Sequence, residues 1–445
     1  MEKMNPVSIS RQLARFVSGL SFQELPQEVV TRAKTLILDA LGTAIAGRNL
    51  PFSALALRVV KENKGSATVL TYSQKVPAMD AAFVNSLLVT SIAQDDMLYI
   101  FHPGAVVIPA ALAISEAENR SGSEVITAIV AGYDVMGRVF LGAPDIVPRF
   151  RGVPVFGPFG AAAASGKLLG LGEDQLTHAL GYAANLSSGF AECWRAGTME
   201  GKFHNGLASR NGVMAALLAR EGVNAAETSL EGESGFYQAF ARTAPDINAM
   251  TSGFGKKFLI MEARSKVYPV CGLEQVPVDL ALMLAKQNGI QGNQIAKIVE
   301  RMPEHELAYP GTNYPGPFTT RFQATMSAQF CIAAAFSGKP VMSYSFYDTG
   351  YDDSEVSELV KKVELVGEKG RNNIRIEVTL LDGKQYSVEG GGEEILTPDV
   401  DRTKVKFQNL ACDFLGKKKM DRVIDMILNL DKLENIKELT RQLSC

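Results

Sequence analysis

Only four histidines occur in the chain, and one of them stands where a loop leads into a helix. His102 lies in Phe101-His102-Pro103-Gly104, directly before an apolar run that predicts a helix over residues 105–118. The N-terminus of a helix offers free N–H groups and a positive dipole end, which suit a carboxylate ligand. Because histidine titrates near neutral pH, His102 could bind a substrate or carry a proton. The alternative is a structural loop histidine.

Two adjacent carboxylates, Asp95 and Asp96, precede this loop and follow an apolar helical stretch. A metal site would need further Asp, Glu or His ligands at suitable spacing, and apolar residues follow instead. We therefore predict no metal. Asp95 or Asp96 could act as a general base or as a polar anchor beside His102, and a plain helix end is the alternative.

Three cationic side chains and a second histidine stand in positions that could hold an anion. Arg151 is a possible anion clamp, since a guanidinium matches a carboxylate with two parallel hydrogen bonds. Lys202 and His204 lie in a polar turn before an apolar helix. Lys266 lies where the helical pattern of the sequence ends, at the inferred junction of two domains. Crevices between domains are favoured ligand sites.

A glycine-rich stretch, Gly157-Pro158-Phe159-Gly160, could be mistaken for a phosphate-binding loop. It lacks the Gly-Lys-Ser/Thr ending of such loops, and no strand precedes it. Four alanines follow it directly. We interpret the stretch as a place where helices pack closely.

The elements that must position these residues are mostly helical. Apolar residues recur at helical spacing from Ser8 to about Ala263 and again from Thr403 onward. Beyond the opening helices, this spacing predicts helices over 105–118, 123–140, 159–170, 174–188, 206–221 and 256–263. We expect residues 5–265 and 402–445 to form one large all-helical domain.

The intervening residues, 266–401, predict a smaller α+β lid domain. A helix is expected from about Gln275 to Lys286, a strand over 295–302 and two further helices over 324–335 and 353–363. Residues 373–389 alternate between apolar and polar side chains and contain the turn pair Asp382-Gly383, which predicts a β-hairpin. The fold class is therefore mainly α, with two domains.

Composition narrows the class of protein. At 445 residues the chain exceeds the roughly 250–300 residues at which one hydrophobic core stops growing. A net charge of -3 without a Lys/Arg cluster argues against nucleic-acid binding. No segment has the ~20 apolar residues of a membrane span, and the N-terminus lacks a signal-peptide core. The odd, scattered cysteines suit reduced thiols, so we expect a cytoplasmic protein; they are Cys193, Cys271, Cys331, Cys412 and Cys445.

Several motifs occur in series along nearly the whole chain. They are Phe101-His102-Pro103-Gly104 leading into Pro109-Ala110-Ala111-Leu112, Gly157-Pro158-Phe159-Gly160-Ala161-Ala162-Ala163, Gly197-Thr198 with Lys202, His204 and Gly206, and Lys266-Val267-Tyr268-Pro269-Val270-Cys271. In this order they resemble the 2-methylcitrate dehydratase (MmgE/PrpD) family, which contains dehydratases, decarboxylases and epimerases of small carboxylates.

The resemblance implies a large helical domain with a smaller lid, a homodimer, no metal or organic cofactor, and an active site between the two domains. It also implies roles for individual residues. Lys202 and Lys266 would hold carboxylates, while His102 would bind the substrate or move a proton next to one. Tyr268 in the motif Lys266–Cys271 and Gln275 shortly after it are further candidates for substrate contact, as is His204.

This sequence departs from the family pattern at several positions. The family often carries His-x-Leu-Asp-Phe-Asp-Asp-Thr-His before the histidine loop, where this chain has Thr90 to Leu98 and keeps only the Asp pair. Family histidines align on Arg151 and Gln275. We expect apolar Ala93, Met97 and Leu98 to shrink the polar part of the pocket. Because an arginine cannot exchange a proton near neutral pH, the substrate is expected to differ from 2-methylcitrate.

The leading hypothesis is a cofactor-independent lyase, a dehydratase or a decarboxylase, that removes a proton alpha to a carboxylate of a small di- or tricarboxylate. An epimerase of a small dicarboxylate uses the same first step and is the nearest alternative. A third possibility is a non-catalytic carboxylate-binding protein on the same fold, suggested by the missing histidines.

Overall fold

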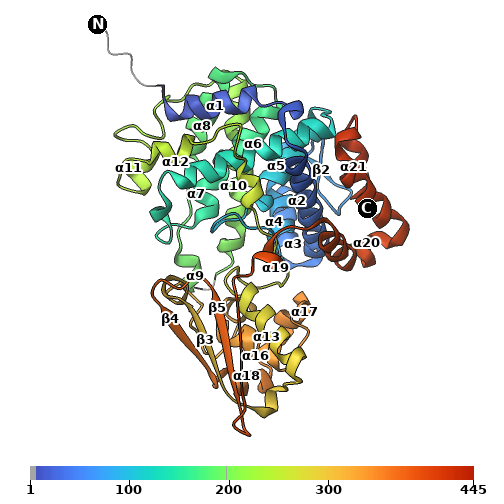
Figure 1. Cartoon of the computed structure of the whole chain (residues 1–445). Helices are drawn as coiled ribbons and strands as arrows, with labels where there is room; N and C mark the ends of the chain where they lie inside the picture. The colour runs from blue at the N-terminus through green and yellow to red at the C-terminus, as the bar shows by residue number, and fades with distance from the viewer. Residues whose placement is uncertain (1–6, 197, 445) are drawn as a thin grey trace.

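The computed structural model describes residues 7–196 and 198–444, and its helices and strands form two domains. Figure 1 shows most helices gathered in one large domain, with a smaller domain at one end of it. We call residues 266–396 the lid domain and the remaining described residues the helical domain. The prediction of a mainly α protein with a smaller α+β domain is confirmed.

The helical domain is built from helices joined mostly by short loops. They are α1 (Ile9–Gly19), α2 (Gln27–Ala46), α3 (Pro51–Val60), α4 (Ala78–Thr90), α5 (Gly104–Ala117), α6 (Gly122–Leu141), α7 (Gly152–Leu168), α8 (Glu173–Asn185), α9 (Glu192–Ala196), α10 (Glu200–Arg220), α11 (Phe236–Phe240), α12 (Ile247–Thr251), α20 (Val400–Leu428) and α21 (Lys437–Gln442). The last two return from the lid, and Phe407 of α20 packs closely on Gly42 of α2. The C-terminal helices therefore pack against the helices that begin the chain.

Three details of this domain differ from the prediction. It is not all helical, because β1 (Ala67–Thr68) and β2 (Lys75–Val76) form a small antiparallel ladder too short to give a periodic signal. The helix expected over 256–263 is only a 3-10 turn, Leu259–Glu262. Helix α10 begins at Glu200 instead of residue 206, so the predicted polar turn is its first two turns.

Helix α7 also begins earlier than predicted, and a proline near its start explains why the sequence misleads. Pro158 lies inside the helix, where it has no N–H to give to the carbonyl of Pro154. The N–H of Ser188 donates to that carbonyl at 3.2 Å instead. The backbone acceptor is thus satisfied from outside the helix, and the helix continues through the proline.

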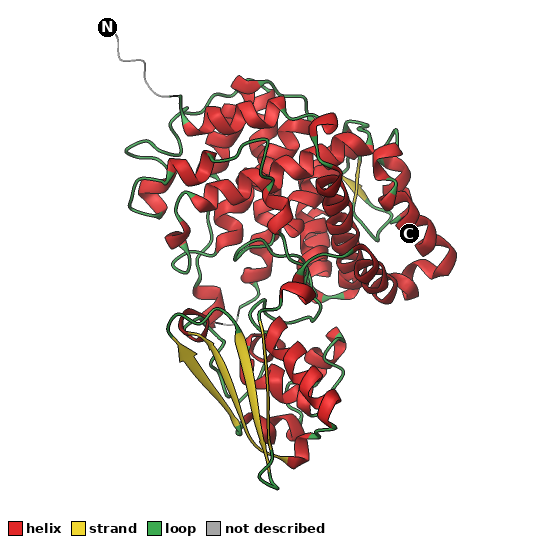
Figure 2. Cartoon of the chain, viewed as in Figure 1, coloured by secondary structure: helices red, strands yellow, loops and turns green. Residues whose placement is uncertain are grey.

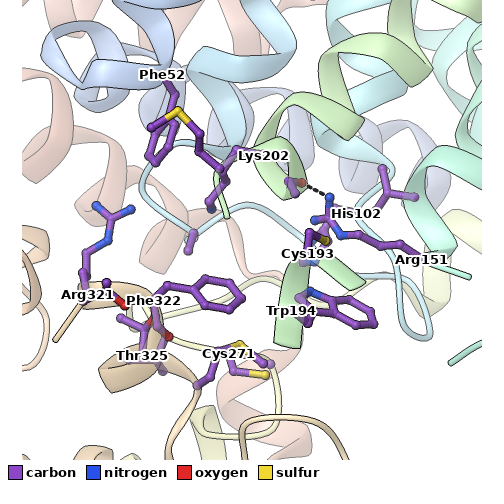
Figure 3. A pocket seen from close by; sticks show the side chains of 18 of the residues that line it. Phe52, His102, Arg151, Cys193, Trp194, Lys202, Cys271, Arg321, Phe322 and Thr325 are labelled. Carbon is purple, nitrogen blue, oxygen red and sulfur yellow. Dashed lines mark hydrogen bonds between the residues drawn. The ribbon is translucent and has the colours of Figure 1, made fainter. Parts of the chain in front are cut away.

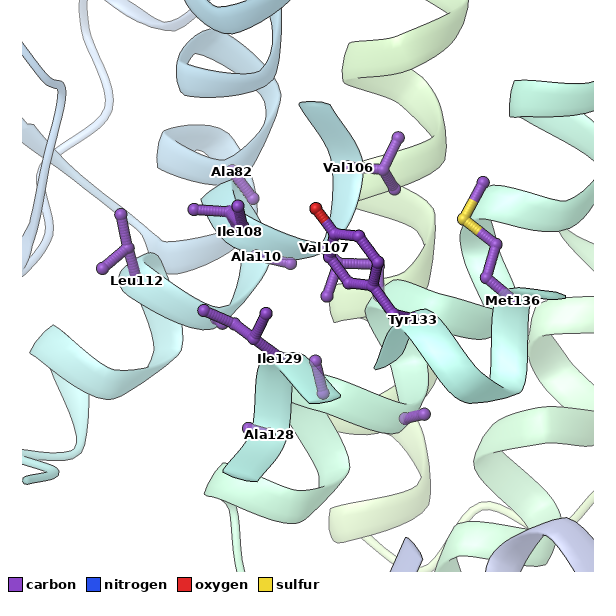
Figure 4. Packing of buried hydrophobic residues seen from close by; sticks show 14 of the residues in the cluster. Ala82, Val106, Val107, Ile108, Ala110, Leu112, Ala128, Ile129, Tyr133 and Met136 are labelled. Carbon is purple, nitrogen blue, oxygen red and sulfur yellow. The ribbon is translucent and has the colours of Figure 1, made fainter. Parts of the chain in front are cut away.

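Small side chains let the central helices approach closely, as the glycine-rich stretch predicts. A Cβ on Gly132 of α6 would lie 2.8 Å from the carbonyl oxygen of Gly160 in α7. A Cβ on Gly212 of α10 would lie 2.3 Å from the Cβ of Ala161. Figure 4 shows the neighbouring packing of Val107 in α5 against Tyr133 in α6. This tight core fixes the ends of α5, α7 and α10, where the candidate site residues lie.

The lid domain has one sheet covered on one face by helices, as Figure 2 shows. Its strands run in the order β4-β3-β5-β6, with β3 and β4 parallel and the other pairs antiparallel. The elements are α13 (Gln275–Asn288), β3 (Ile295–Pro303), α14 (Glu304–Leu307), α15 (Arg321–Met326), α16 (Ala328–Phe336), α17 (Tyr344–Thr349), α18 (Ser354–Val360), β4 (Val363–Glu368), β5 (Ile374–Leu380), β6 (Gln385–Gly390) and α19 (Glu393–Leu396).

The predicted hairpin is present as β5 and β6, and Gly383 turns it with a φ of 86°. Strand β4 is a correction, since its first residue falls in the helix expected over 353–363. That helix, α18, ends at Val360, and only the following residues pair with β3.

Buried hydrophobic side chains form two separate clusters. One draws on residues between Ile9 and Ala263 together with residues between Phe407 and Leu443, and the other on residues between Tyr268 and Leu396. The predicted domain limits, 5–265 with 402–445 and 266–401, separate the same groups of residues and remain a prediction. Helix α20 starts slightly before residue 402, and residue 5 lies outside the described residues.

Among the described residues, no helix combines the length and the apolar character that crossing a membrane requires.

Candidate active site

A cavity of about 360 Å³ lies between the helical domain and the lid. Its size falls in the range of small-molecule sites, and such sites favour domain interfaces. The helical domain contributes the loop before α5 and the first turns of α3, α7 and α10. The lid contributes α15 and residues 270–272 of its first segment, residues 266–274, which we call the junction segment. Four of the residues singled out in the sequence line this one cavity: His102, Arg151, Lys202 and Lys266.

His102 is held by one edge of its ring. Its Nδ1 lies 2.9 Å from the carbonyl oxygen of Asp96 and 3.3 Å from Oδ2 of Asp95. Both neighbours are acceptors, so the proton of the neutral ring sits on Nδ1 and Nε2 keeps its lone pair. Nε2 is on the ring edge that remains for the cavity. His102 can therefore accept a proton there.

The protonation states of this pair follow from burial and charge. Burial, aided by Lys266, lowers the pKa of His102 to about 4, although Asp95 opposes the shift. Burial alone would raise the pKa of Asp95, but the charges of His102, Lys266 and Lys202 outweigh it and hold that pKa below its usual value. At neutral pH the pair is thus a carboxylate beside a neutral imidazole. This is the starting state of a general base.

Asp96 has a different placement from its neighbour. Neither Asp95 nor Asp96 lines the cavity, but the side chain of Asp96 points away from His102 and accepts hydrogen bonds from the N–H of Gly104 at 2.8 Å and from the hydroxyl of Tyr133 at 2.7 Å. Burial raises the pKa of Asp96 to about 7. The helix N-terminus that the sequence offered to a substrate carboxylate is thus occupied by a carboxylate of the protein. We regard Asp96 as a positioning residue for the His102 loop.

Lys202 reaches the cavity from the first turn of α10. Its Nζ donates to the carbonyl oxygen of Thr90 at 2.8 Å, which fixes the side chain against the end of α4. Burial lowers the pKa of Lys202 to about 7, and Asp95 only partly offsets this. An anion placed beside it would restore the full charge. Lys202 is therefore suited to a carboxylate.

Lys266 is fixed through both its side chain and its backbone. Its Nζ donates to the carbonyl oxygen of Ala93 at 3.1 Å, and its own carbonyl accepts from Nζ of Lys406 at 2.8 Å. Lys406 also donates to the carbonyl of Gln94 and pairs with buried Asp39 at 2.6 Å. The C-terminal helix α20 thus ties the junction segment to the loop that carries Asp95.

Arg151 lies immediately before α7, and its guanidinium donates to the carbonyl oxygen of Gly201, as Figure 3 shows. It also lies over the ring of Trp194, 5.9 Å from the centroid. Burial lowers the pKa of Arg151, but an arginine remains charged at neutral pH. Arg151 and His102 therefore place a permanent cation and a base on the same side of the cavity.

Three predicted contact residues do not line the cavity. Tyr268 is buried and donates from its hydroxyl to Asp279 at 2.9 Å. Gln275 is fully buried, and its amide bonds the backbone of Val267 and Tyr268. His204 is farther along α10, and burial lowers its pKa to about 4. We regard Tyr268 and Gln275 as supports of the junction segment that carries Lys266.

The sequence predicts that apolar residues at positions 93, 97 and 98 make the pocket less polar, but only one of these residues lines the cavity. Ala93 lines the cavity, whereas Met97 and Leu98 do not, because Met97 joins a bridge with Arg264 and Leu98 is fully buried in the core. In the motif Gly197-Thr198, Thr198 lines the cavity and Gly197 lies outside the described residues.

The sequence did not reveal Arg321, a basic residue of the lid that lines the cavity, or the aromatic residues around it. Arg321 begins α15 and lines the cavity together with Phe322, as Figure 3 shows. Trp194 of α9 and Tyr309 of the lid meet with ring centroids 5.6 Å apart. No pattern in the sequence marks Arg321, because it is an isolated cation in an irregular segment. Only the lid fold brings it to the cavity.

The cavity carries a surplus of positive charge. Four basic side chains reach it, and the acidic side chain on its lining, Asp348, is more than half exposed. Within the described ranges, no cluster of three or more His, Cys, Asp or Glu side chains is arranged to hold a metal ion. The arrangement fits an anionic substrate with more than one carboxylate, held near a histidine base.

Two family models and several curated proteins match the chain. The model of the MmgE/PrpD N-terminal domain matches residues 11–247, and that of the C-terminal domain matches residues 268–432. Among curated proteins, the cis-aconitate decarboxylase of Aspergillus terreus is 26% identical, with 98% of this chain and 96% of that protein covered. The human cis-aconitate decarboxylase is 27% identical, with 97% and 94% covered. The cis-aconitate decarboxylase-like protein oryM of Aspergillus oryzae is 24% identical, with 98% and 97% covered.

Proposed function

The chain belongs to the MmgE/PrpD family, and we propose that it is a cofactor-independent lyase that removes a proton alpha to a carboxylate of a small di- or tricarboxylate. The observation that carries the proposal is the position of His102. Its Nδ1 is fixed by Asp96 and Asp95, and the ring lines a cavity with four cations. The names of the relatives, cis-aconitate decarboxylases, support a lyase.

The cations do the binding and much of the electrostatic work in this proposal. Lys202, Lys266 and Arg151 hold the substrate carboxylates. When the alpha proton leaves, its bonding electrons move onto the adjacent carboxylate, which then carries a second negative charge. Fixed cations at that carboxylate stabilise the charge as it develops, without reorganising. Removing one such group typically costs about 10²- to 10³-fold in rate.

His102 moves the proton. Its neutral Nε2 takes the alpha proton, and the resulting imidazolium is stabilised by the carboxylate of Asp95 3.3 Å from Nδ1. In a dehydration, the electron pair then expels a beta hydroxide, which leaves as water after taking a proton. A decarboxylation begins without this removal of an alpha proton: a carbon–carbon bond breaks, carbon dioxide leaves, and the electron pair of that bond moves to a carbon that then takes a proton from water through His102.

We place decarboxylation of a cis-aconitate-like tricarboxylate first among these outcomes, because it is the reaction in the names of the relatives. The surplus of cations also suits a substrate with three carboxylates better than a substrate with two. Epimerisation and binding without turnover remain the alternatives.

A product assay in D2O separates these outcomes. Purified protein is incubated with cis-aconitate, citrate and 2-methylcitrate and followed by proton NMR. Loss of carbon dioxide with a deuterated product identifies a decarboxylase, and a new alkene with loss of water a dehydratase. Deuterium in recovered substrate alone identifies an epimerase. Stabilisation of the fold by these acids with neither exchange nor product would contradict the lyase proposal.

The lack of a cofactor, the homodimer and a cytoplasmic location belong to the same proposal. Full activity after dialysis against a chelator supports cofactor independence, and light scattering on the eluted protein gives the mass of the assembly. Of the five cysteines, the four in the described residues are free, in keeping with a reducing compartment, and Cys445 lies outside those residues.

A further inference from the structure

Arg321 of the lid domain lines the cavity, and we propose that it binds a substrate carboxylate at the end of the cavity away from His102. The lid would then select acids that span the cavity with a further carboxylate. The inference rests on the proposed function, because it assumes that the cavity binds the reacting acid. The lid would thus contribute to substrate selectivity.

The first support is a buried guanidinium with poor partners. The side chain of Arg321 is 16% exposed, and its ion pair with Asp348 is long, at 3.7 Å. Asp348 itself is 55% exposed, so solvent weakens its hold. Within the part of the chain that the structure describes, no hydrogen bond engages the five N–H groups of this guanidinium. The side chain keeps part of its exposure at the cavity it lines, so a carboxylate that enters the cavity can accept hydrogen bonds from these groups.

The second support is the way aromatic rings hold the group. The guanidinium carbon lies 4.2 Å from the ring centroid of Tyr344 and 5.9 Å from that of Phe52. Tyr344 belongs to the lid and Phe52 to the helical domain. Contact with ring faces engages the plane of the guanidinium and leaves its N–H edge free for a carboxylate. Burial lowers the pKa of Arg321 to about 10, which still leaves it charged at neutral pH.

The third support is the relation of Arg321 to the other cations. Arg321 contributes to lowering the pKa of Lys202, after the larger effect of burial, so the two positive groups act on the same space. In Figure 3, Arg321 and Arg151 lie on opposite sides of the cavity with Lys202 between them. Two cationic ends with a third cation between them match an acid with carboxylates at both ends of a short chain.

The competing explanation is that Arg321 only packs on Tyr344 and fastens the lid. In that case Asp348 is its intended partner, and removing Asp348 leaves ligand binding unchanged. If a substrate carboxylate takes the guanidinium, Asp348 competes with it, and removing Asp348 strengthens binding. The two explanations therefore predict different results for one substitution.

The test compares two unreactive acids by calorimetry on the full-length protein: tricarballylate, with three carboxylates, and succinate, which lacks one carboxymethyl end. We expect the wild type to prefer tricarballylate. Arg321→Gln should weaken the binding of tricarballylate by about 10- to 100-fold, which is the usual contribution of a hydrogen bond to a charged group. The affinity for succinate should not change. Arg371→Gln, which alters a lid arginine paired with Glu368 and Glu389 outside the cavity, should match the wild type.

A second variant, Asp348→Asn, keeps the inference testable even if Arg321→Gln folds poorly. It should bind tricarballylate more tightly than the wild type, because the guanidinium loses a competing carboxylate. An unchanged preference for tricarballylate in Arg321→Gln, or tricarballylate binding by Asp348→Asn that is unchanged or weaker, overturns the inference. If the preference depends on Arg321 but no tested acid is turned over, the inference stands and the proposed lyase activity fails.

Discussion

Nδ1 of His102 lies 3.3 Å from Oδ2 of Asp95, and the Asp95 side chain is almost completely buried. The same nitrogen lies 2.9 Å from the carbonyl oxygen of Asp96. Together these acceptors fix which ring nitrogen carries the proton. The proposed catalysis depends on this arrangement, because it leaves Nε2 free to act as a base that faces a cavity lined by cations.

Asp95→Asn tests the charge beside the ring. The amide can still occupy the space, but it cannot stabilise an imidazolium. We expect kcat to fall by about 10²-fold or more, with little change in the affinity for tricarballylate. Steady-state kinetics and calorimetry on the same preparation separate the two effects. If the variant binds tricarballylate more weakly but keeps its kcat, Asp95 acts on the neighbouring cations and not on His102.

Lys202 gives a prediction about pH. Its pKa is lowered to about 7, so the free enzyme loses this positive charge as the pH rises through that value. Since kcat/KM reports ionisations of the free enzyme, we expect kcat/KM to fall above about pH 7. Lys202→Arg keeps a charge that does not titrate, and its profile should stay flat there. Identical alkaline limbs in the two proteins would mean that another group titrates.

The close helix packing predicts a stability contrast between two glycines. A Cβ on Gly212 would lie 2.3 Å from the Cβ of Ala161 and 2.6 Å from the carbonyl oxygen of Pro158. We expect Gly212→Ala to destabilise the fold by about 1–3 kcal/mol through overpacking. A Cβ on Gly19, at the end of α1, would meet no atom within 4 Å, so Gly19→Ala is the matched control. Urea unfolding should leave this control unchanged or slightly more stable.

The lid contains two buried carboxyl groups, Glu300 of β3 and Glu274 before α13, whose oxygens have no hydrogen-bond partner among the described residues. Burial, aided by Glu306, raises the pKa of Glu300 to about 8. The folded state therefore binds more protons than the unfolded state, and stability is lost as the pH rises toward and through that value.

Glu300→Gln removes this ionisation while keeping the shape of the side chain. We expect the Tm of the wild type to fall between about pH 5 and about pH 9, and that of the variant to fall less. Glu364→Gln, at a lid position paired with Lys297 near the surface, serves as the control and should follow the wild type. Parallel curves for all three proteins would contradict the assignment.

The sequence predicts the fold class because periodicity and small residues are local signals. The runs that form α5 and α6 and the alternation in β5 are visible without tertiary knowledge. Where a local rule and tertiary contacts disagree, the prediction fails. The helix predicted from residue 159 begins at Gly152, because Ser188 donates to the carbonyl of Pro154 that Pro158 cannot serve.

The candidate site was predictable in its motifs and unpredictable in its geometry. Asp95 and Asp96 are equivalent in the sequence, yet the side chain of one faces His102 and that of the other accepts from the first N–H of α5. Tyr268 and Gln275 lie close to Lys266 in the sequence, but their side chains point into the lid and hold the junction segment. Arg321 carries no local signal at all. The roles of His102, Lys202, Lys266 and Arg151 remain predictions that kinetics must decide.

The most direct measurement is the fate of solvent deuterium with the wild type and with His102→Gln, using cis-aconitate and proton NMR. We predict that the wild type forms a decarboxylated product carrying deuterium from D2O. His102→Gln should bind tricarballylate as the wild type does and form product about 10²- to 10⁴-fold more slowly. A His102→Gln protein that forms the same deuterated product within about tenfold of the wild-type rate would contradict the central claim.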